Sequence, residues 1–105
     1  MDAAEQLLDR ETVAAFCRRW RIQELAVFGS ALREDFHSDS DLDVLVSYAP
    51  DAAWSLLDHV AMEEELARLV GRPVDLVTRR AVERSENWIR RQAILESAQV
   101  VYAER

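Results

Sequence analysis

Two aspartates, Asp41 and Asp43, stand two positions apart at the start of an apolar segment that runs from Leu42 to Tyr48. In a β-strand the side chains of residues i and i+2 point to the same face, so these two carboxylates are expected side by side. Carboxylates held that close repel one another unless a cation lies between them. Such a pair either extends into solvent, which is the alternative for Asp41 in particular, or binds a cation, so the head of this strand is a candidate cation site.

A third carboxylate, Asp75, lies within a short apolar segment at residues 74–77. A charge within an apolar strand is costly unless it is paired or bound to a metal. If this strand lies beside the one that carries Asp41 and Asp43, the three side chains form a ligand set of oxygen atoms alone. Such a set suits Mg²⁺ or Mn²⁺ better than zinc. Two such ions about 4 Å apart can activate one oxygen and stabilise the leaving oxygen in phosphoryl or nucleotidyl transfer.

Gly29 and Ser30 follow another apolar segment at residues 25–28, and ten residues separate them from the aspartate pair. Glycine lets the backbone approach a phosphate closely, and a serine hydroxyl with the N–H groups after it can bind phosphate oxygens. Arg33 is the nearest cation and is a candidate ligand for a triphosphate. A surface ion pair with a neighbouring acid is the alternative for Arg33.

The composition limits the classes of function that the chain can have. With 105 residues it has the length of one domain, residues 1–105, and its net charge of −7 argues against nonspecific binding to nucleic acid. We expect no membrane span and no signal peptide. The single cysteine, Cys17, excludes an internal disulfide and a multi-cysteine zinc site, which favours a cytoplasmic location. All thirteen basic residues are arginine, so no lysine base or phosphate-binding lysine is present.

Apolar periodicity predicts the elements that must position these residues. Amphipathic helices are expected over 4–20, 52–70 and 85–98, and Gly71 is expected to cap the second of them. Strands are expected over 25–28, 42–48 and 74–77, with a final edge strand at 100–102. This order predicts an α/β (α+β) fold with a small mixed sheet flanked by helices.

Two further predictions concern the faces of the helices. The three glutamates at positions 63–65 are expected to face solvent. The apolar side of the second helix is expected to consist of Leu56, Val60, Met62, Leu66, Leu69 and Val70.

Five arginines fall between positions 79 and 91, which makes this stretch locally basic in an acidic chain. A solvated helix face is the usual explanation, and part of a partner surface is the alternative. Trp88 within the stretch, and Trp54 before it, are candidates either for interface anchors or for the core.

The motif Gly29-Ser30, ten residues, then Asp41-x-Asp43, with Asp75 on a later strand, resembles the polymerase-β-type nucleotidyltransferase superfamily. A lone D-x-D pattern is a weak indication, whereas the two-part motif in the expected strand context is fairly specific. The chain looks closest to the minimal nucleotidyltransferases, which include the antitoxins of the HEPN/MNT toxin–antitoxin systems of bacteria and archaea. The likeness runs from about residue 25 to residue 77, and the tail over residues 94–102 also resembles these short proteins.

The resemblance implies a nucleotidyltransferase fold and transfer of AMP from ATP to an acceptor, with pyrophosphate as the leaving group. It implies that Asp41 and Asp43 bind two Mg²⁺ ions and that Asp75 is the third carboxylate, which assists the nucleophile. Gly29 and Ser30 would hold the triphosphate. In the antitoxin branch the acceptor is a tyrosine of the HEPN ribonuclease toxin, which adenylylation silences, so the resemblance also implies this partner and a hetero-oligomer.

Two alternatives stay open at this point. One is an enzyme of the same superfamily that adenylylates a small molecule, although 105 residues leave little chain for a separate substrate-binding domain. The other is a binding module that neutralises its partner by occlusion, without catalysis.

Overall fold

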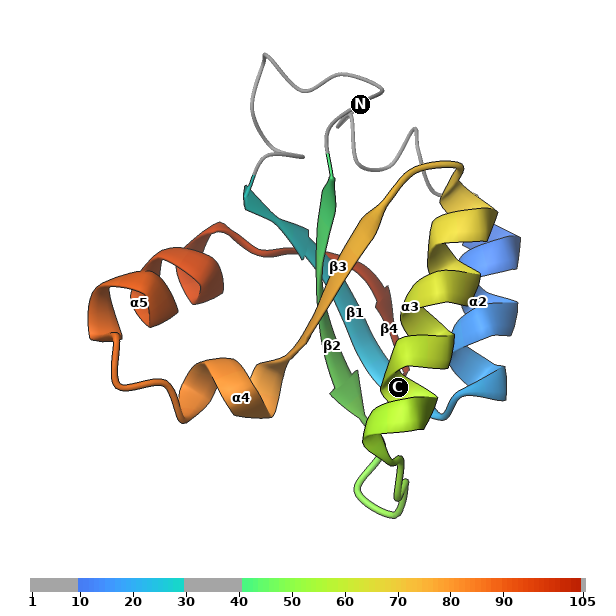
Figure 1. Cartoon of the computed structure of the whole chain (residues 1–105), viewed down its shortest axis with the longest axis horizontal. Helices are drawn as coiled ribbons and strands as arrows, with labels where there is room; N and C mark the ends of the chain where they lie inside the picture. Colours follow the sequence, from blue (N-terminus) through green and yellow to red (C-terminus); the bar gives the residue numbers. More distant parts are fainter. Residues whose placement is uncertain (1–9, 30–40, 105) are drawn as a thin grey trace.

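The computed structural model describes residues 10–29 and 41–104. Along the chain these form α2 (Arg10–Arg19), β1 (Ile22–Phe28), β2 (Leu42–Tyr48), α3 (Leu56–Val70), β3 (Val74–Thr78), α4 (Arg79–Glu83), α5 (Trp88–Ser97) and β4 (Gln99–Ala103) (Figure 1). Within these ranges the strands make one sheet in the order β3-β2-β1-β4. β1 runs antiparallel to β2 and β4, whereas β2 and β3 are parallel. A mixed sheet flanked by helices confirms the predicted fold class.

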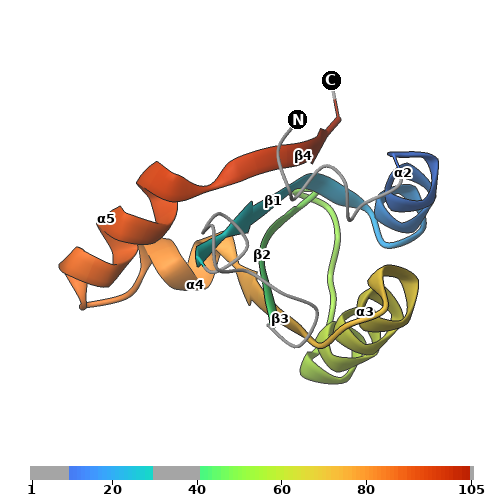
Figure 2. The ribbon, with the colours of Figure 1, turned by 90° about the horizontal axis from the view of Figure 1, so that it is seen from above.

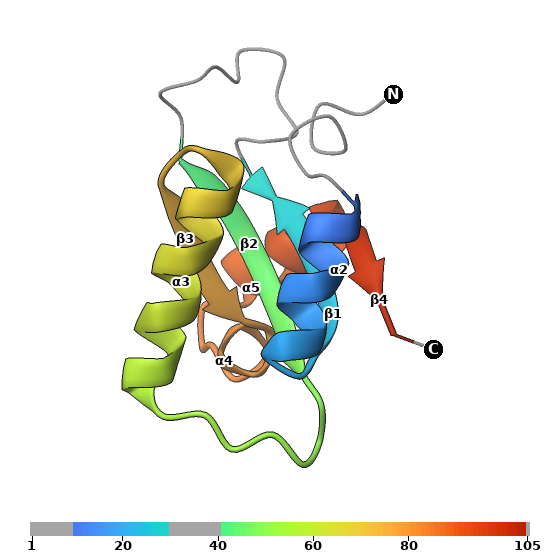
Figure 3. The ribbon, with the colours of Figure 1, turned by 90° about the vertical axis from the view of Figure 1, so that its right-hand side faces the viewer.

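Helices cover both faces of the sheet. α2 and α3 lie side by side against one face (Figure 3), and α4 and α5 lie on the opposite side (Figures 1 and 2). We call these the α2/α3 face and the α4/α5 face. Alternation along β2 divides its side chains between them, because Val44 packs on the α2/α3 face and Leu45 on the α4/α5 face.

The two faces have cores of different size. On the α4/α5 face the buried core residues are Ala26, Phe28, Leu45, Val82 and Ile94. On the α2/α3 face they are Val13, Phe16, Cys17, Ile22, Leu25, Val27, Leu42, Val44, Val46, Met62, Leu66 and Leu76.

The first elements are close to the predicted ones. The helix predicted over 4–20 is α2 in its described part, where it ends at Arg19, and residues 4–9 lie outside the described ranges. The strand predicted over 25–28 begins earlier, at Ile22, and β2 has the predicted bounds.

α3 begins at Leu56 rather than at residue 52, because Ser55 caps it. The Ser55 hydroxyl accepts a hydrogen bond from the Asp58 N–H at 3.2 Å, and the Asp58 carboxylate accepts one from the Ser55 N–H at 2.9 Å. This reciprocal pair is a capping box, which satisfies two backbone donors at the helix start. Gly71 ends the helix in the left-handed conformation, with φ of 73°, as predicted.

The predicted apolar side of α3 was wrong in half of its residues. Met62 and Leu66 are buried and Val70 packs against the core. In contrast, Leu56 is 78% exposed, and Val60 and Leu69 are 42% exposed. The reason is that α3 packs on β3, an edge strand, and turns polar side chains toward its backbone, as described below.

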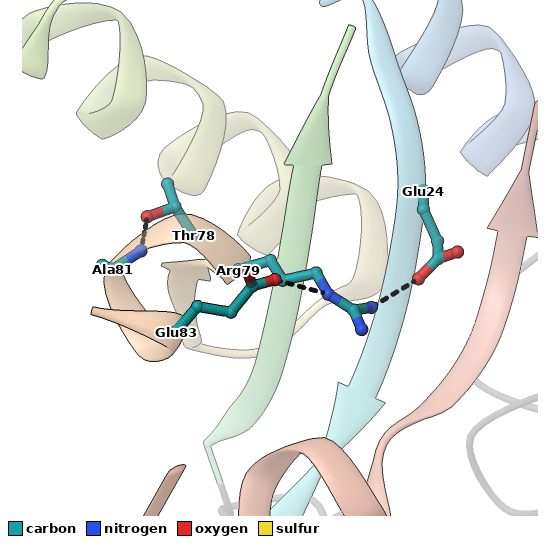
Figure 4. A network of polar contacts seen from close by, with 5 residues as sticks. All are labelled: Glu24, Thr78, Arg79, Ala81 and Glu83. Carbon is teal, nitrogen blue, oxygen red and sulfur yellow. Dashed lines mark hydrogen bonds and ion pairs between the residues drawn. The ribbon is translucent and has the colours of Figure 1, made fainter. Parts of the chain in front are cut away.

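The C-terminal third contains a helix that the sequence did not predict. α4 follows β3 directly, and its start is capped by the Thr78 hydroxyl, which accepts from the Ala81 N–H at 3.2 Å (Figure 4). The helix predicted over 85–98 begins at Trp88, where the Asn87 side chain accepts from the Arg90 N–H at 3.1 Å. The predicted edge strand is confirmed as β4, one residue longer at each end.

Trp54 is partly buried and packs against the core of the α2/α3 face. Its ring meets that of Trp20 edge to face, with centroids 5.3 Å apart, and its indole N–H donates to the Trp20 carbonyl at 2.7 Å. No helix in the ranges that the structure describes is both long and apolar enough to cross a membrane.

Candidate active site

The parallel pairing of β2 with β3 brings two of the predicted carboxylates together. Asp43 and Asp75 are direct partners in the register of the two strands. Both point to the α4/α5 face, because Leu45 and Val77, two residues further along each strand, pack there. The three-carboxylate prediction depended on these two strands being neighbours; this condition is met, and their register places Asp43 next to Asp75.

Gly29 lies against the Asp43 carboxylate. Its neighbour Phe28 pairs with Asp43 across β1 and β2, and Gly29 follows with φ of 68°. A Cβ atom at Gly29 would lie 2.5 Å from Oδ2 of Asp43, far inside van der Waals contact. The position therefore requires glycine twice over, for its backbone conformation and for the space that the carboxylate fills.

Asp41 directly precedes β2 and is exposed, as is Asp75, whereas Asp43 is half-buried. The start of β2 is held to the start of β3, because the Leu42 N–H donates to the Pro73 carbonyl at 2.9 Å. Ser30 and Arg33, the other two predicted site residues, lie outside the described ranges.

The donor chemistry of this end of the sheet fits a hard divalent cation. Asp41, Asp43 and Asp75 offer carboxylate oxygens, which Mg²⁺ and Mn²⁺ prefer. In residues 10–29 and 41–104, however, no group of three or more His, Cys, Asp or Glu side chains is already arranged to hold a metal ion. The register joins Asp43 to Asp75, and the three-carboxylate ligand set stays a prediction.

Two side chains of α3 bind the backbone of β3 beside Asp75. Nε2 of His59 donates to the Leu76 carbonyl at 2.7 Å, and a Glu63 carboxylate oxygen accepts from the Leu76 N–H at 2.8 Å. We call this pair the edge clamp. It satisfies both outward backbone groups of Leu76 on an edge strand, and it fixes the peptide that follows Asp75.

Tyr48 completes the edge clamp. In the tautomer of His59 that carries its single proton on Nε2, Nδ1 accepts from the Tyr48 hydroxyl at 3.1 Å. Burial raises the pKa of Tyr48 to about 12, so the hydroxyl stays protonated as a donor at neutral pH. Sequence reasoning missed this role of Glu63 and expected a solvated glutamate. The four-residue spacing of His59 and Glu63, which puts both on one side of a helix, was the available signal.

A second polar contact holds α4 to the sheet on the other side. Nε of Arg79 donates to Glu83 at 3.0 Å and Nη1 donates to Glu24 of β1 at 3.2 Å (Figure 4). Figure 4 shows the Arg79 side chain crossing β2 to reach β1. These ion pairs are half-exposed, so they contribute little to the free energy of folding and serve mainly to orient α4 relative to β1. They tie the start of α4 to β1, at the beginning of the segment from α4 to α5 (residues 79–97), which we call the α4–α5 hairpin.

The sequence profile of the nucleotidyltransferase domain family matches residues 9–101. The chain belongs to this family. This nucleotidyltransferase is 42% identical over 59 residues to the protein adenylyltransferase MntA of Thermococcus cleftensis, which covers 56% of the chain and 58% of the relative. It is 34% identical over 64 residues to a provisionally named protein adenylyltransferase of Methanocaldococcus jannaschii, across 61% and 63% of the two chains. The chain thus spans about 60% of the length of these curated relatives.

Solved structures extend the likeness over nearly the whole nucleotidyltransferase chain. One provisionally named minimal nucleotidyltransferase is 33% identical, covers 94% of this chain and 95% of its own, and superposes with a TM-score of 0.68. A toxin–antitoxin structure with AMP-PNP superposes with a TM-score of 0.70 at 20% identity, over 93% and 76% of the two chains. The second likeness concerns the fold alone. The family predicted from the motif is confirmed.

Proposed function

We propose that this nucleotidyltransferase transfers AMP from ATP to a hydroxyl group of a partner protein, in a reaction that depends on Mg²⁺. The observation that carries the proposal is the packing of Gly29 on the Asp43 carboxylate, with Asp75 in register beside it. This juxtaposition joins the expected phosphate-binding turn to the expected metal ligands. The names of the curated relatives, protein adenylyltransferases, support the same chemistry.

In the proposed reaction Asp41 and Asp43 hold the metal ions. When bound, the ions neutralise charge on the triphosphate and lower the pKa of the acceptor hydroxyl. Asp75 accepts the proton of that hydroxyl as its oxygen attacks the α-phosphorus of ATP. The bond between the α-phosphorus and the bridging oxygen breaks, and pyrophosphate leaves with the electron pair.

The nucleotide side of the site is assigned by the motif. Gly29 has a φ of 68° at the end of β1, and we assign it and Ser30 to the triphosphate, with Arg33 as a further cationic contact. A relative of the same fold with AMP-PNP in its structure supports ATP as the substrate.

We propose that the partner is a HEPN-type toxin and that the protein is its antitoxin in a hetero-oligomer. A tri-AMPylated HEPN toxin of Shewanella oneidensis with its MNT antitoxin supports this, since the fold matches with a TM-score of 0.58 at 20% identity, over 95% and 73% of the two chains. Because the reaction consumes ATP and the one cysteine, Cys17, is a buried free thiol, we place it in the cytoplasm.

The test uses ATP labelled at the α-phosphate, Mg²⁺, the purified protein and a lysate of its source cells. We expect a labelled protein band whose mass points to the acceptor. The Asp41→Asn/Asp43→Asn double variant should give no band, because it loses the metal ligands. Glu64→Gln, the same chemical change at an exposed position of α3, is the matched control and should label like the wild type.

The other outcomes separate the rival functions. Label in a small molecule would indicate a small-molecule adenylyltransferase. If the wild type transfers no label while a partner co-purifies equally with the double variant, the protein acts by occlusion and the proposed catalysis is wrong.

A further inference from the structure

Two large apolar side chains are exposed at the tip of the α4–α5 hairpin. Trp88 is 60% exposed and Ile89 is 65% exposed, next to one another at the start of α5. Figure 1 shows the hairpin projecting from the sheet on the side away from α2 and α3. We define the hairpin tip as Arg84, Trp88, Ile89 and Arg90. Adjacent exposed tryptophan, isoleucine and arginine side chains are typical of protein contact surfaces.

The hairpin differs in charge from the rest of the chain. Residues 79–91 hold five arginines against two glutamates, a local charge of +3 in a chain with a net charge of −7. Two of these arginines make contacts within the protein. Arg79 forms ion pairs with its two glutamates, and Arg91 donates a hydrogen bond to the Ser85 carbonyl at 3.0 Å. Within the described ranges, the side chains of Arg84 and Arg90 make no ion pair or hydrogen bond, so their charge faces outward.

A small pocket connects the hairpin to the carboxylate side of the sheet. It has a volume of about 130 Å³, and Val77 of β3 and Arg90, Arg91 and Ile94 of α5 contribute to its lining. Val77 points to the same face as Asp75, two residues before it, which is roughly 7 Å along a strand. A polypeptide seated on the hairpin tip therefore lies on the side of the sheet where the carboxylates point.

We propose that the hairpin tip docks an acidic segment of the acceptor protein. Trp88 and Ile89 would anchor its apolar side chains, and Arg84 and Arg90 would pair with its carboxylates. The inference rests on the proposed function and deepens it by assigning the acceptor surface. Charge complementarity carries it, because an acidic partner is repelled by the rest of this acidic chain and attracted here. Arginine and tryptophan are also the residues in which binding energy concentrates.

Binding is tested first without any need for the acceptor. The probe is a fluorescent peptide of alternating glutamate and leucine, followed by anisotropy at low ionic strength. The variants are Arg84→Glu/Arg90→Glu and Trp88→Ala/Ile89→Ala. Arg10→Glu/Arg68→Glu is the matched control, since it makes the same charge change at exposed arginines of α2 and α3. There are two competing probes. One is a lysine–leucine peptide, which has the opposite charge, and the other is a single-stranded oligonucleotide with the same charge as the acidic peptide.

We expect the wild type and the control to bind the acidic peptide alike, and both tip variants to bind roughly thirtyfold more weakly. Circular dichroism should show that all four proteins are folded. Equal binding by tip variants and control would overturn the docking site. Tighter binding of the oligonucleotide than of the acidic peptide would overturn it in favour of a nucleic acid surface.

Labelling of the acceptor then separates this inference from the function on which it rests. In the tip variants we expect the KM for the acceptor protein to rise by roughly the same factor, with the KM for ATP unchanged. An unchanged acceptor KM contradicts the docking site while leaving the transferase activity intact. Absence of AMP transfer by the wild type contradicts the proposed function instead, and the peptide result stands on its own.

Discussion

The two faces of the sheet are formed by the same strands, but one face carries most of the buried core and the other carries the candidate site. In the described part of the chain, twelve buried residues fill the α2/α3 face and five fill the α4/α5 face. On the α4/α5 face, Asp43 and Asp75 stand in register at one end, next to Gly29. The face with the larger core gains the burial that stabilises the fold, whereas the other face keeps room for charge.

Strand β2 shows how close together these two roles lie. Val44 is 1% exposed in the larger core, while its neighbour Asp43 points to the opposite face. Because one residue separates the two environments, neighbouring substitutions on β2 act on different properties. Val44 and Leu45 are both buried, so changing either acts on stability, whereas changing Asp43 acts on the candidate site. The comparison therefore predicts which property each variant will lose.

The largest expected effect is on chemistry alone. If the proposed function holds, Asp43→Asn should lower kcat/KM for AMP transfer roughly a thousandfold, since it removes a proposed metal ligand worth several kcal/mol in the transition state. The melting temperature without Mg²⁺ should change less than in a variant of the buried core, because Asp43 is half-buried and belongs to neither buried cluster. Differential scanning fluorimetry should show that Mg²⁺ raises the melting temperature of the wild type and not of the variant. Identical wild-type curves in EDTA and in Mg²⁺ would contradict the metal site.

The reverse result is expected on the α2/α3 face. Leu66→Ala removes a fully buried side chain and should lower the free energy of unfolding by about 2–5 kcal/mol. Urea denaturation measures this loss, and the activity per folded molecule should stay near that of the wild type. A Leu66→Ala protein that is fully folded but inactive would show that the two faces are not separable in this way.

Gly29→Ala should affect both properties, because it brings a methyl group to the Asp43 carboxylate. The substitution combines the cost of φ at 68° with a Cβ placed 2.5 Å from Oδ2, so the carboxylate must move. Gly71→Ala is the matched control, since its φ is 73° but nothing lies within 4 Å of the added Cβ. Both should lose roughly 1–2 kcal/mol of stability through the backbone. Loss of AMP transfer should be confined to Gly29→Ala.

Only part of this difference between the two faces could be predicted from the sequence. The alternation of side chains along β2 could be predicted from the sequence, because it is a local property of a strand. The pairing of β2 with β3, which sets Asp43 beside Asp75, joins distant segments and was only a condition of the predicted ligand set. α4 was not predictable from periodicity, since five residues are too few to show a helical period. Its start depends on the Thr78 cap, and its place depends on the long-range pair of Arg79 with Glu24.

The inward polar contacts of α3 could not be predicted from the sequence for a similar reason. Which face of a helix turns inward depends on what it packs against. In the described part of the chain, α3 packs on an edge strand whose outward backbone groups have no further strand to pair with. His59 and Glu63 therefore point inward, and Leu56 is left in solvent. The roles of Ser30 and Arg33 rest on the motif alone, because both lie outside the described ranges.

The edge clamp links the two faces and should give a smaller effect. Glu63→Ala leaves the Leu76 N–H without its acceptor, which should cost about 1–3 kcal/mol of stability and loosen the peptide next to Asp75. We expect kcat to fall while the KM for ATP is unchanged. Glu63→Gln keeps an oxygen acceptor and should restore much of both. A kcat equal to that of the wild type in Glu63→Ala would show that the clamp has no influence on Asp75.

The last expected effect is a dependence of stability on alkaline pH, which belongs to the α2/α3 face. Burial raises the pKa of Cys17 from 9.0 to about 12, against a slight lowering by Arg18, and burial also raises the pKa of Tyr48 from 10.0 to about 12. Both groups are neutral in the fold and ionise more readily when unfolded. Their stabilising contribution is therefore complete below pH 9 and is lost as the pH rises toward 12.

Urea denaturation at pH 8 and at pH 11 tests this sign. The wild type should lose stability between the two, and the loss should be smaller in Cys17→Ala and in Tyr48→Phe, each of which removes one titrating group. Tyr48→Phe also gives up the hydrogen bond to His59, so its stability at pH 8 should be lower by about 1 kcal/mol. Asp43→Asn is the control from the other face and should keep the wild-type difference between pH 8 and pH 11. If Asp43→Asn flattened the alkaline loss as well, the faces would be electrostatically coupled, and the separation of stability from chemistry would not hold.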